Sequence, residues 1–229
     1  MNIIQSSKSE CEMQVANIIA EKLNELASKK EHVVFGICGG TSVKGIFSHL
    51  LNKEIQWNKI HIFMVDERCV SLNSLESNYK LAYDTFIHRL IEQYKLPQEN
   101  AHPFIYDSTN AYSGLKKYEN IIAKFNRKFD LILLSAGEDG HVGALYPNHR
   151  SISNESTTFF MMNDSPKPPK DRMTSSRKLL QTAQVAILLF FGQGKQQAFE
   201  KFQDPALQIK NCPAKLISSI PESYVFRGD

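Results

Sequence analysis

The sequence predicts an α/β fold: a single doubly wound, mostly parallel sheet with helices on both faces and a small extra loop and strand elaboration. Two observations predict it. Short apolar runs alternate with longer amphipathic stretches, as in units that join parallel strands by right-handed crossovers. The runs are apolar on both faces, which is typical of parallel strands covered on each side. We expect residues 1–229 to form one domain.

The four predicted strands are short β-branched or aliphatic runs bounded by Gly, Asp or Asn, and they lie at residues 33–38, 60–65, 130–134 and 185–191. Amphipathic helices are expected at about 10–28, 43–52, 77–94, 111–126 and 194–202, where apolar residues recur at helical spacing. Residues 148–184 are irregular, because the prolines of the SPKPPK stretch exclude a helix and a central strand. Within them, residues 157–162 are expected to form an extra strand.

The composition excludes several classes of protein. The 27 Lys+Arg and 24 Asp+Glu leave a net charge of +3, which is too weak to indicate a nucleic-acid binder. The longest apolar run, residues 185–191, is far shorter than the roughly 20 residues of a membrane helix, and no secretory signal is visible. The cysteines form no C-x-x-C pair, so we expect reduced thiols in a cytoplasmic protein that needs no metal or other cofactor; they are Cys11, Cys38, Cys69 and Cys212.

Glycines and hydroxyl groups follow the first predicted strand, at the edge where open α/β sheets bind ligands. The turn Gly39-Gly40-Thr41-Ser42 is followed by Lys44 and a predicted helix. Glycine lets the backbone approach an anion, and a helix start offers unpaired N–H groups. The turn is not a Walker A loop, since Ile46 stands where that loop needs lysine. A tight turn without a ligand is the alternative.

Charged residues follow two other predicted strands. After the second strand, Arg68 can bind a phosphate and Asp66 can accept a hydrogen bond from a sugar hydroxyl, although such charges are often solvated turn residues. Lys195 follows the fourth strand at a helix start, where it can reach a bound anion. The irregular segment supplies Lys167 and Arg172, which taken alone would be solvated charges on a proline-rich loop.

The third strand ends in Ser135-Ala-Gly-Glu-Asp-Gly-His141, the most informative segment. An imidazole has the proton affinity of a general base, and Asp139 or Glu138 can orient it; an exposed polar turn is the alternative. No H-E-x-x-H or Cys/His pair supports a metal site, and no G-x-S-x-G elbow supports a nucleophilic serine. Together the strand ends predict an enzyme that acts on a small phosphorylated, hydroxyl-rich substrate by proton transfer.

At these residues the sequence resembles the 6-phosphogluconolactonases, within the wider group that includes glucosamine-6-phosphate deaminases. The resemblance is carried by GGTS at 39–42, VDERCV at 65–70, SNY at 77–79, GEDGHVGALYP at 137–147, SPKPPKDRMT at 165–174 and GQGK at 192–195. It implies hydrolysis of 6-phospho-D-glucono-1,5-lactone to 6-phosphogluconate in the oxidative pentose phosphate pathway, with no cofactor. The chain departs from the usual pattern at Val43, where proline is common, at Ser135-Ala136, and at residues 143–146.

The resemblance also implies roles for individual residues. His141 would take a proton from the water that attacks the lactone, and Asp139 or Glu138 would orient the imidazole or the water. Arg68 and Arg172 would hold the 6-phosphate together with the turn at 39–42, and Lys195 would lie near the phosphate or the developing oxyanion.

Two other functions stay open. A glucosamine-6-phosphate deaminase or isomerase would carry a glutamate shortly after its histidine, whereas residues 144–147 contain no carboxylate. A non-catalytic sugar-phosphate binding protein would not need the base and its carboxylate. We expect a small sugar phosphate as the ligand, no nucleic-acid or membrane partner, and a monomer as the simplest assembly.

Overall fold

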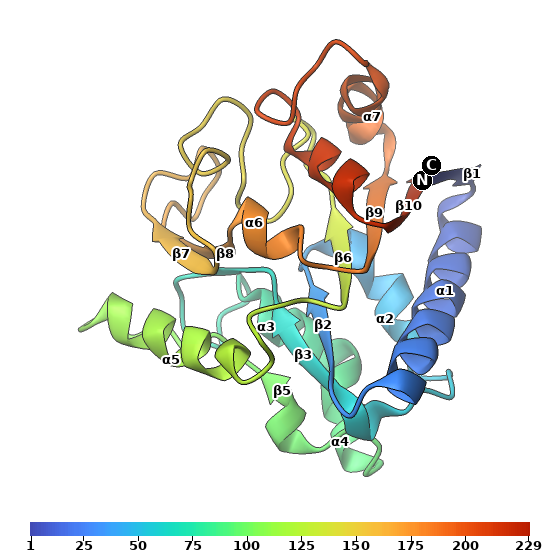
Figure 1. Cartoon of the computed structure of the whole chain (residues 1–229), viewed down its shortest axis with the longest axis vertical. Helices are drawn as coiled ribbons and strands as arrows, with labels where there is room; N and C mark the ends of the chain where they lie inside the picture. Colours follow the sequence, from blue (N-terminus) through green and yellow to red (C-terminus); the bar gives the residue numbers. More distant parts are fainter.

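The computed structural model describes the backbone of residues 1–229 and every side chain except those of residues 111 and 113. Its main sheet has seven strands in the order β1-β10-β9-β6-β2-β3-β5, and all the pairs are parallel (Figure 1). The strands are β1 (Asn2–Ser6), β2 (Val33–Ile37), β3 (Ile60–Met64), β5 (Ala101–His102), β6 (Leu131–Ser135), β9 (Val185–Phe191) and β10 (Glu222–Gly228). The predicted α/β class is confirmed.

Helices cover both faces of this sheet, with α1 and α2 on one side and α5 and α6 on the other (Figure 1). The helices are α1 (Lys8–Lys29), α2 (Lys44–Leu50), α3 (Asn78–Ala82), α4 (His88–Glu92), α5 (Ala111–Ala123), α6 (Arg177–Leu180) and α7 (Gln196–Gln203). A π-helical turn, η3 (Tyr83–Ile87), joins α3 to α4. Short 3₁₀ turns are η1 (Thr41–Val43), η2 (Trp57–Lys59), η4 (Gln98–Asn100), η5 (Gln193–Lys195) and η6 (Pro213–Ser219). Each predicted helix is present, and no described helix is long and apolar enough to cross a membrane.

A second, antiparallel sheet supplies the predicted elaboration. It consists of β4 (Asp66–Arg68), β8 (Arg172–Ser175) and β7 (Phe159–Met162) in that order. The extra strand expected at residues 157–162 is confirmed as β7. Residues 66–68, by contrast, are a strand and not a solvated turn, because Asp66 and Glu67 are buried and pair with β8. In this pairing Arg68 lies directly opposite Arg172.

The register of the central strands brings their carboxyl ends together. Ile37 at the end of β2 lies opposite Met64 of β3 and Leu133 of β6. The segments that follow these strands therefore begin at one edge of the sheet. Three strands were not predicted from the sequence: β1 and β10 at one end of the sheet and β5 at the other. They extend the sheet on either side of the central strands.

Candidate active site

A cavity of about 390 Å³ lies at the carboxyl ends of β2, β6 and β9, where the main sheet meets the small one. Side chains and turns far apart in the sequence line it together. Among the predicted site residues, those that line the cavity are Gly39, Gly40, Thr41, Ser42, Asp66, Arg68, Glu138, His141, Lys167, Arg172 and Lys195. The structure thus brings nearly the whole predicted set into one place.

Two predicted residues lie outside the lining. Lys44 is the first residue of α2, and its side chain is exposed. It is one step beyond the turn that faces the cavity, so its charge acts only at longer range. Asp139 does not line the cavity either, because its carboxylate lies against the imidazole of His141.

The carboxylate of Asp139 fixes the orientation of His141. One of its oxygens lies 2.5 Å from the Nδ1 of His141 and accepts a hydrogen bond from the backbone N–H of the same residue at 3.1 Å. Burial would raise the pKa of Asp139, but the hydrogen bond and charge of His141 outweigh burial and hold it well below its ordinary value. Because Nδ1 is occupied by an ionised carboxylate, Nε2 is the ring nitrogen that can exchange a proton with a ligand.

Glycines shape the turn that carries this pair. Gly140 has a φ of +89°, a conformation that other residues rarely adopt. A Cβ added to Gly137 would lie 1.9 Å from Cε1 of His141, so the imidazole occupies the space that a side chain would fill. Hydrogen bonds close the turn, since the N–H of Gly137 donates to the carbonyl of His141 at 2.8 Å.

The two arginines of the cavity are held differently. Arg172 is nearly buried and donates from Nε and Nη2 to the carbonyls of Pro169 and Pro168, at 3.1 and 3.0 Å. Its Nη1 also lies 3.7 Å from the carboxylate of Asp66. Arg68 donates from Nη1 to the carbonyl of Glu76 at 2.7 Å, but its buried Nε has no partner. Arg68 therefore retains the greater capacity to bind an anion.

Two lysines, Lys167 and Lys195, add positive charge to the lining of the cavity. In the described part of the chain, neither Lys167 nor Lys195 makes a hydrogen bond or ion pair through its ammonium group. Burial lowers the pKa of Lys195, while the charge of Glu138 opposes that shift. A half-buried cation with no fixed partner is favourably placed to stabilise negative charge on a ligand.

Two turns at this edge have the same backbone. Gly40 follows β2 with a φ of +93°, and Gly192 follows β9 with a φ of +94°. Each precedes a 3₁₀ turn, η1 or η5, that leads into a helix. The positive φ turns the chain sharply, so that backbone N–H groups at a helix start can approach an anion.

Sequence reasoning missed a buried amide in the lining. Asn78 starts α3, as expected, with Ser77 as its N-cap. Its Nδ2 donates to the carbonyl of Asp66 at 3.0 Å, and a Cβ on Gly39 would lie only 2.0 Å from its Oδ1. The amide thus contacts both the first glycine turn and β4. The sequence signal was the SNY motif at 77–79, which begins a predicted helix and belongs to the family resemblance, but no role was assigned to its amide.

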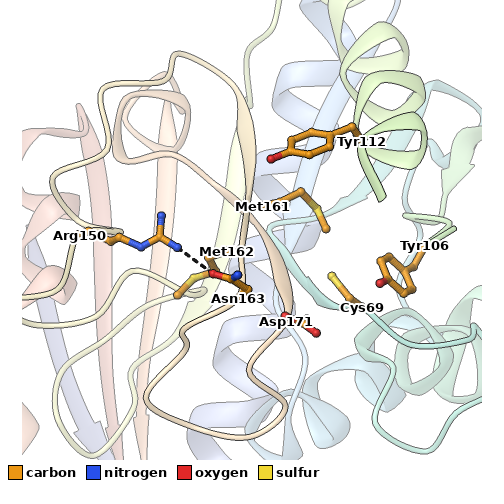
Figure 2. Close-up of a pocket in the computed structure, with 8 residues that line it drawn as sticks. All are labelled: Cys69, Tyr106, Tyr112, Arg150, Met161, Met162, Asn163 and Asp171. Atoms are coloured by element: carbon orange, nitrogen blue, oxygen red, sulfur yellow. Dashed lines mark hydrogen bonds between the residues drawn. The ribbon is translucent and has the colours of Figure 1, made fainter. Parts of the chain in front are cut away.

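A second cavity, of about 380 Å³, lies beside β7, whose Met161 and Met162 line it (Figure 2). Tyrosine, methionine and cysteine side chains make up most of its lining, and no predicted site residue belongs to it. Its arginine, Arg150, donates to Asn163 at 3.2 Å and is paired with Asp164. Among the described side chains, no group of three or more His, Cys, Asp or Glu could hold a metal ion. His141 and four predicted cationic side chains line the first cavity and not this one.

Comparison with known proteins identifies the family of this chain. The family described as glucosamine-6-phosphate isomerases/6-phosphogluconolactonase matches residues 6–225. The chain belongs to this family. It is 32% identical to the 6-phosphogluconolactonase of Borreliella burgdorferi, over 88% of this chain and 86% of the relative. It is 30% identical to 6-phosphogluconolactonase 3 of Saccharomyces cerevisiae strain S288c, over 94% of this chain and 88% of the relative.

Solved structures share the fold. The 6-phosphogluconolactonase of Thermotoga maritima superposes with a TM-score of 0.84 at 24% identity and covers 100% of this chain and 99% of its own. A monomeric glucosamine-6-phosphate deaminase superposes with a TM-score of 0.81 at 18% identity, over 100% and 97% of the two chains. Since both activities occur on this fold, the fold does not distinguish them.

Proposed function

We propose that this protein hydrolyses 6-phospho-D-glucono-1,5-lactone to 6-phosphogluconate by general-base activation of water. The observation that carries the proposal is the His141–Asp139 pair beside a cavity that four cationic side chains line. A histidine held by a carboxylate suits proton transfer near neutral pH. The cations suit a substrate that carries a phosphate dianion.

The proton transfers run through one nitrogen. Nε2 of His141 takes a proton from water as the water oxygen bonds to the lactone carbonyl carbon. When the tetrahedral adduct collapses, the bond from that carbon to the ring oxygen breaks, and the imidazolium returns the proton to the ring oxygen. Asp139 stabilises the imidazolium between the two steps. Lys195 offsets the negative charge that develops on the carbonyl oxygen.

The remaining charges bind the substrate. Arg68 and Lys167 have donors free for the 6-phosphate, next to the glycine turn at residues 39–42. Arg172 contributes charge to the same region, while its own hydrogen bonds hold the carbonyls of Pro168 and Pro169. Asp66 lies at the cavity wall, where it can accept from a sugar hydroxyl. Glu138 is exposed at the rim, so we assign the orienting role to Asp139.

The chain lacks the glutamate that a deaminase would carry shortly after its histidine. The positions that follow His141 are occupied by Ala144, Leu145 and Tyr146, all buried and without a carboxylate. We further propose that residues 1–229 work as one domain, as a monomer in the cytoplasm, on a small sugar phosphate and not on nucleic acid.

One assay tests the reaction. Freshly generated 6-phosphogluconolactone is incubated with and without the purified protein, and acid release is followed by pH-stat. We expect the protein to accelerate acid release well above the spontaneous rate. Ammonia release from glucosamine 6-phosphate, measured in parallel, would support the deaminase instead. Binding of 6-phosphogluconate without any acceleration would support a binding protein.

A further inference from the structure

Tyr146 contacts both the proposed base, His141, and the segment that carries Lys167. Its ring packs against the imidazole of His141, with ring centroids 4.7 Å apart and an interplanar angle of 42°. Its hydroxyl group is hydrogen-bonded to the hydroxyl of Ser165 at 2.9 Å. Both residues are buried, with 1% and 3% of their surface exposed. The ring that contacts the base therefore also contacts the proline-rich segment, which we define as residues 165–170.

Ser165 in turn fixes the backbone of Lys167. Its hydroxyl donates to the carbonyl of Lys167 at 2.7 Å, and the N–H of Lys167 donates back to it at 3.3 Å. Lys167 lines the cavity and has no other polar partner for its side chain in the described structure. The backbone of this lysine is thus held by Ser165 and, at 3.4 Å, by Nη2 of Arg172. Ser165 is in turn held by the hydroxyl of Tyr146.

We propose that Tyr146 is a positioning residue, whose ring holds the imidazole of His141 and whose hydroxyl holds the proline-rich segment that places Lys167 at the phosphate. The inference rests on the proposed function, because it assigns phosphate binding to this segment. The ring and the hydroxyl of Tyr146 then have different effects on the enzyme. Loss of the hydroxyl weakens binding, and loss of the ring disturbs the base.

Other contacts keep the segment attached when the hydroxyl is removed. Just before it, Asp164 lies 3.4 Å from Nε2 of His149 and pairs with Arg150, which also donates to Asn163 (Figure 2). At its far end Arg172 donates to the carbonyls of Pro168 and Pro169. A Tyr146→Phe variant is therefore expected to fold and to loosen only the middle of the segment.

The experiment is a double-mutant cycle of Tyr146→Phe and Ser165→Ala. For Tyr146→Phe we expect the KM for the lactone, and the Kd for 6-phosphogluconate by calorimetry, to rise about 3- to 10-fold, as for one lost hydrogen bond. For Ser165→Ala we expect a rise at least as large, because its hydroxyl also bonds the backbone of Lys167. The kcat should stay within about 2-fold, because the ring remains in place. The double variant should be no worse than Ser165→Ala alone, since Ser165→Ala already removes the contact that Tyr146→Phe removes.

A ligand-independent readout accompanies the cycle. Trypsin cleavage after the exposed Lys170 should become about 3- to 10-fold faster in both single variants, because the segment is less restrained. Tyr224→Phe is the matched control: its hydroxyl bonds Glu222 at 2.5 Å in β10, away from the cavity, and its loss should change neither KM nor cleavage.

Distinct outcomes overturn distinct claims. An unchanged Kd and cleavage rate in Tyr146→Phe, or independent additive effects in the double variant, would overturn the positioning role. A fall in kcat at constant KM would do the same, because the hydroxyl would then act on the base. An inactive wild-type protein would overturn the proposed function, and the cleavage rates would still decide whether the hydroxyl restrains the segment.

Discussion

At residue 137, glycine leaves the space that the imidazole of His141 occupies. The Cβ of an alanine there would come within 1.9 Å of Cε1 and 2.1 Å of Nδ1 of His141. The ring cannot retreat easily, because Tyr146 packs against it and Asp139 holds Nδ1. The backbone of Gly137 does not have a positive φ, so alanine strains the ring and not the main chain.

We therefore predict that Gly137→Ala lowers kcat by about 10²-fold or more, which is the scale of misplacing a catalytic group by about 1 Å. The thermal unfolding midpoint should also fall, because the displaced ring is held by Tyr146 and Asp139, so rates are compared well below it. Gly45→Ala is the matched control, because the three atoms nearest to its Cβ would belong to the carboxylate of Glu12, the end of a flexible side chain. Steady-state lactone hydrolysis measures both variants. Wild-type turnover by Gly137→Ala would show that the base tolerates another position.

Removing the base itself should separate chemistry from binding. His141→Ala is expected to lower kcat by about 10²- to 10⁴-fold, the usual contribution of general acid–base catalysis. The affinity for 6-phosphogluconate should remain, since the cations that bind the phosphate are untouched. Calorimetry and pH-stat rates measure the two quantities. Normal turnover in this variant would remove His141 from its role.

Single residues were predictable from the sequence where a motif and a strand end coincide. His141 and Arg68 lie within a few residues of the ends of apolar strands, and both line the cavity. Lys44 was predicted because it follows the glycine turn and could add charge there, but it starts α2 with its side chain exposed. Asn78 and Glu67 were not assigned roles, because a buried amide and a buried carboxylate look like ordinary polar residues until their partners are known.

At the scale of elements, Glu67 joins β4 to the start of α3. Its carboxylate accepts the backbone N–H groups of Asn78 and Tyr79, each at 2.7 Å, and the hydroxyl of Ser77 at 3.0 Å. Burial nevertheless raises its pKa. The first N–H groups of a helix have no partner inside the helix, so this one side chain satisfies the start of α3 and places Asn78 in the cavity.

We predict that Glu67→Gln lowers the free energy of unfolding by about 2 kcal/mol, since charged acceptors contribute roughly 1.5–3 kcal/mol per hydrogen bond and an amide supplies one oxygen fewer. Urea unfolding at neutral pH measures the change. Glu76→Gln, an exposed position nearby, is the control and should unfold like the wild type. Equal stability of the two variants would contradict the anchoring role.

Element prediction succeeded at the centre of the sheet and failed at its margins. Buried on both faces, β2, β3, β6 and β9 carry continuous apolar runs that stand out in the sequence. The outer strand β1 is largely exposed and polar, so its pattern resembles a loop. The charges of β4 likewise suggest a turn, and only its pairing with β8 buries them.

For the whole molecule, the two edges of the sheet differ in chemistry. The carboxyl edge gathers the cations of the cavity, which turns a small net charge into a local attraction for an anion. Near the other edge, three histidines form a hydrogen-bonded chain: Nε2 of His61 lies 3.0 Å from His32, and its Nδ1 lies 3.1 Å from His102. The ring of His61 also packs on Phe125, with centroids 4.3 Å apart.

This chain should make folding sensitive to mild acid. Burial lowers the pKa of His61 from 6.5 to about 4, so the unfolded chain binds a proton at higher pH than the folded one. The contribution of neutral His61 to the free energy of unfolding is fully present above pH 6.5 and is lost as the pH drops toward about 4. When the pH falls from about 7.5 to 4.5, the free energy of unfolding should decrease in both proteins, as measured in urea. The decrease should be about 2 kcal/mol smaller in His61→Phe than in the wild type. The exposed His88→Phe is the control, and equal pH dependence of all three proteins would mean that His61 titrates alike in both states.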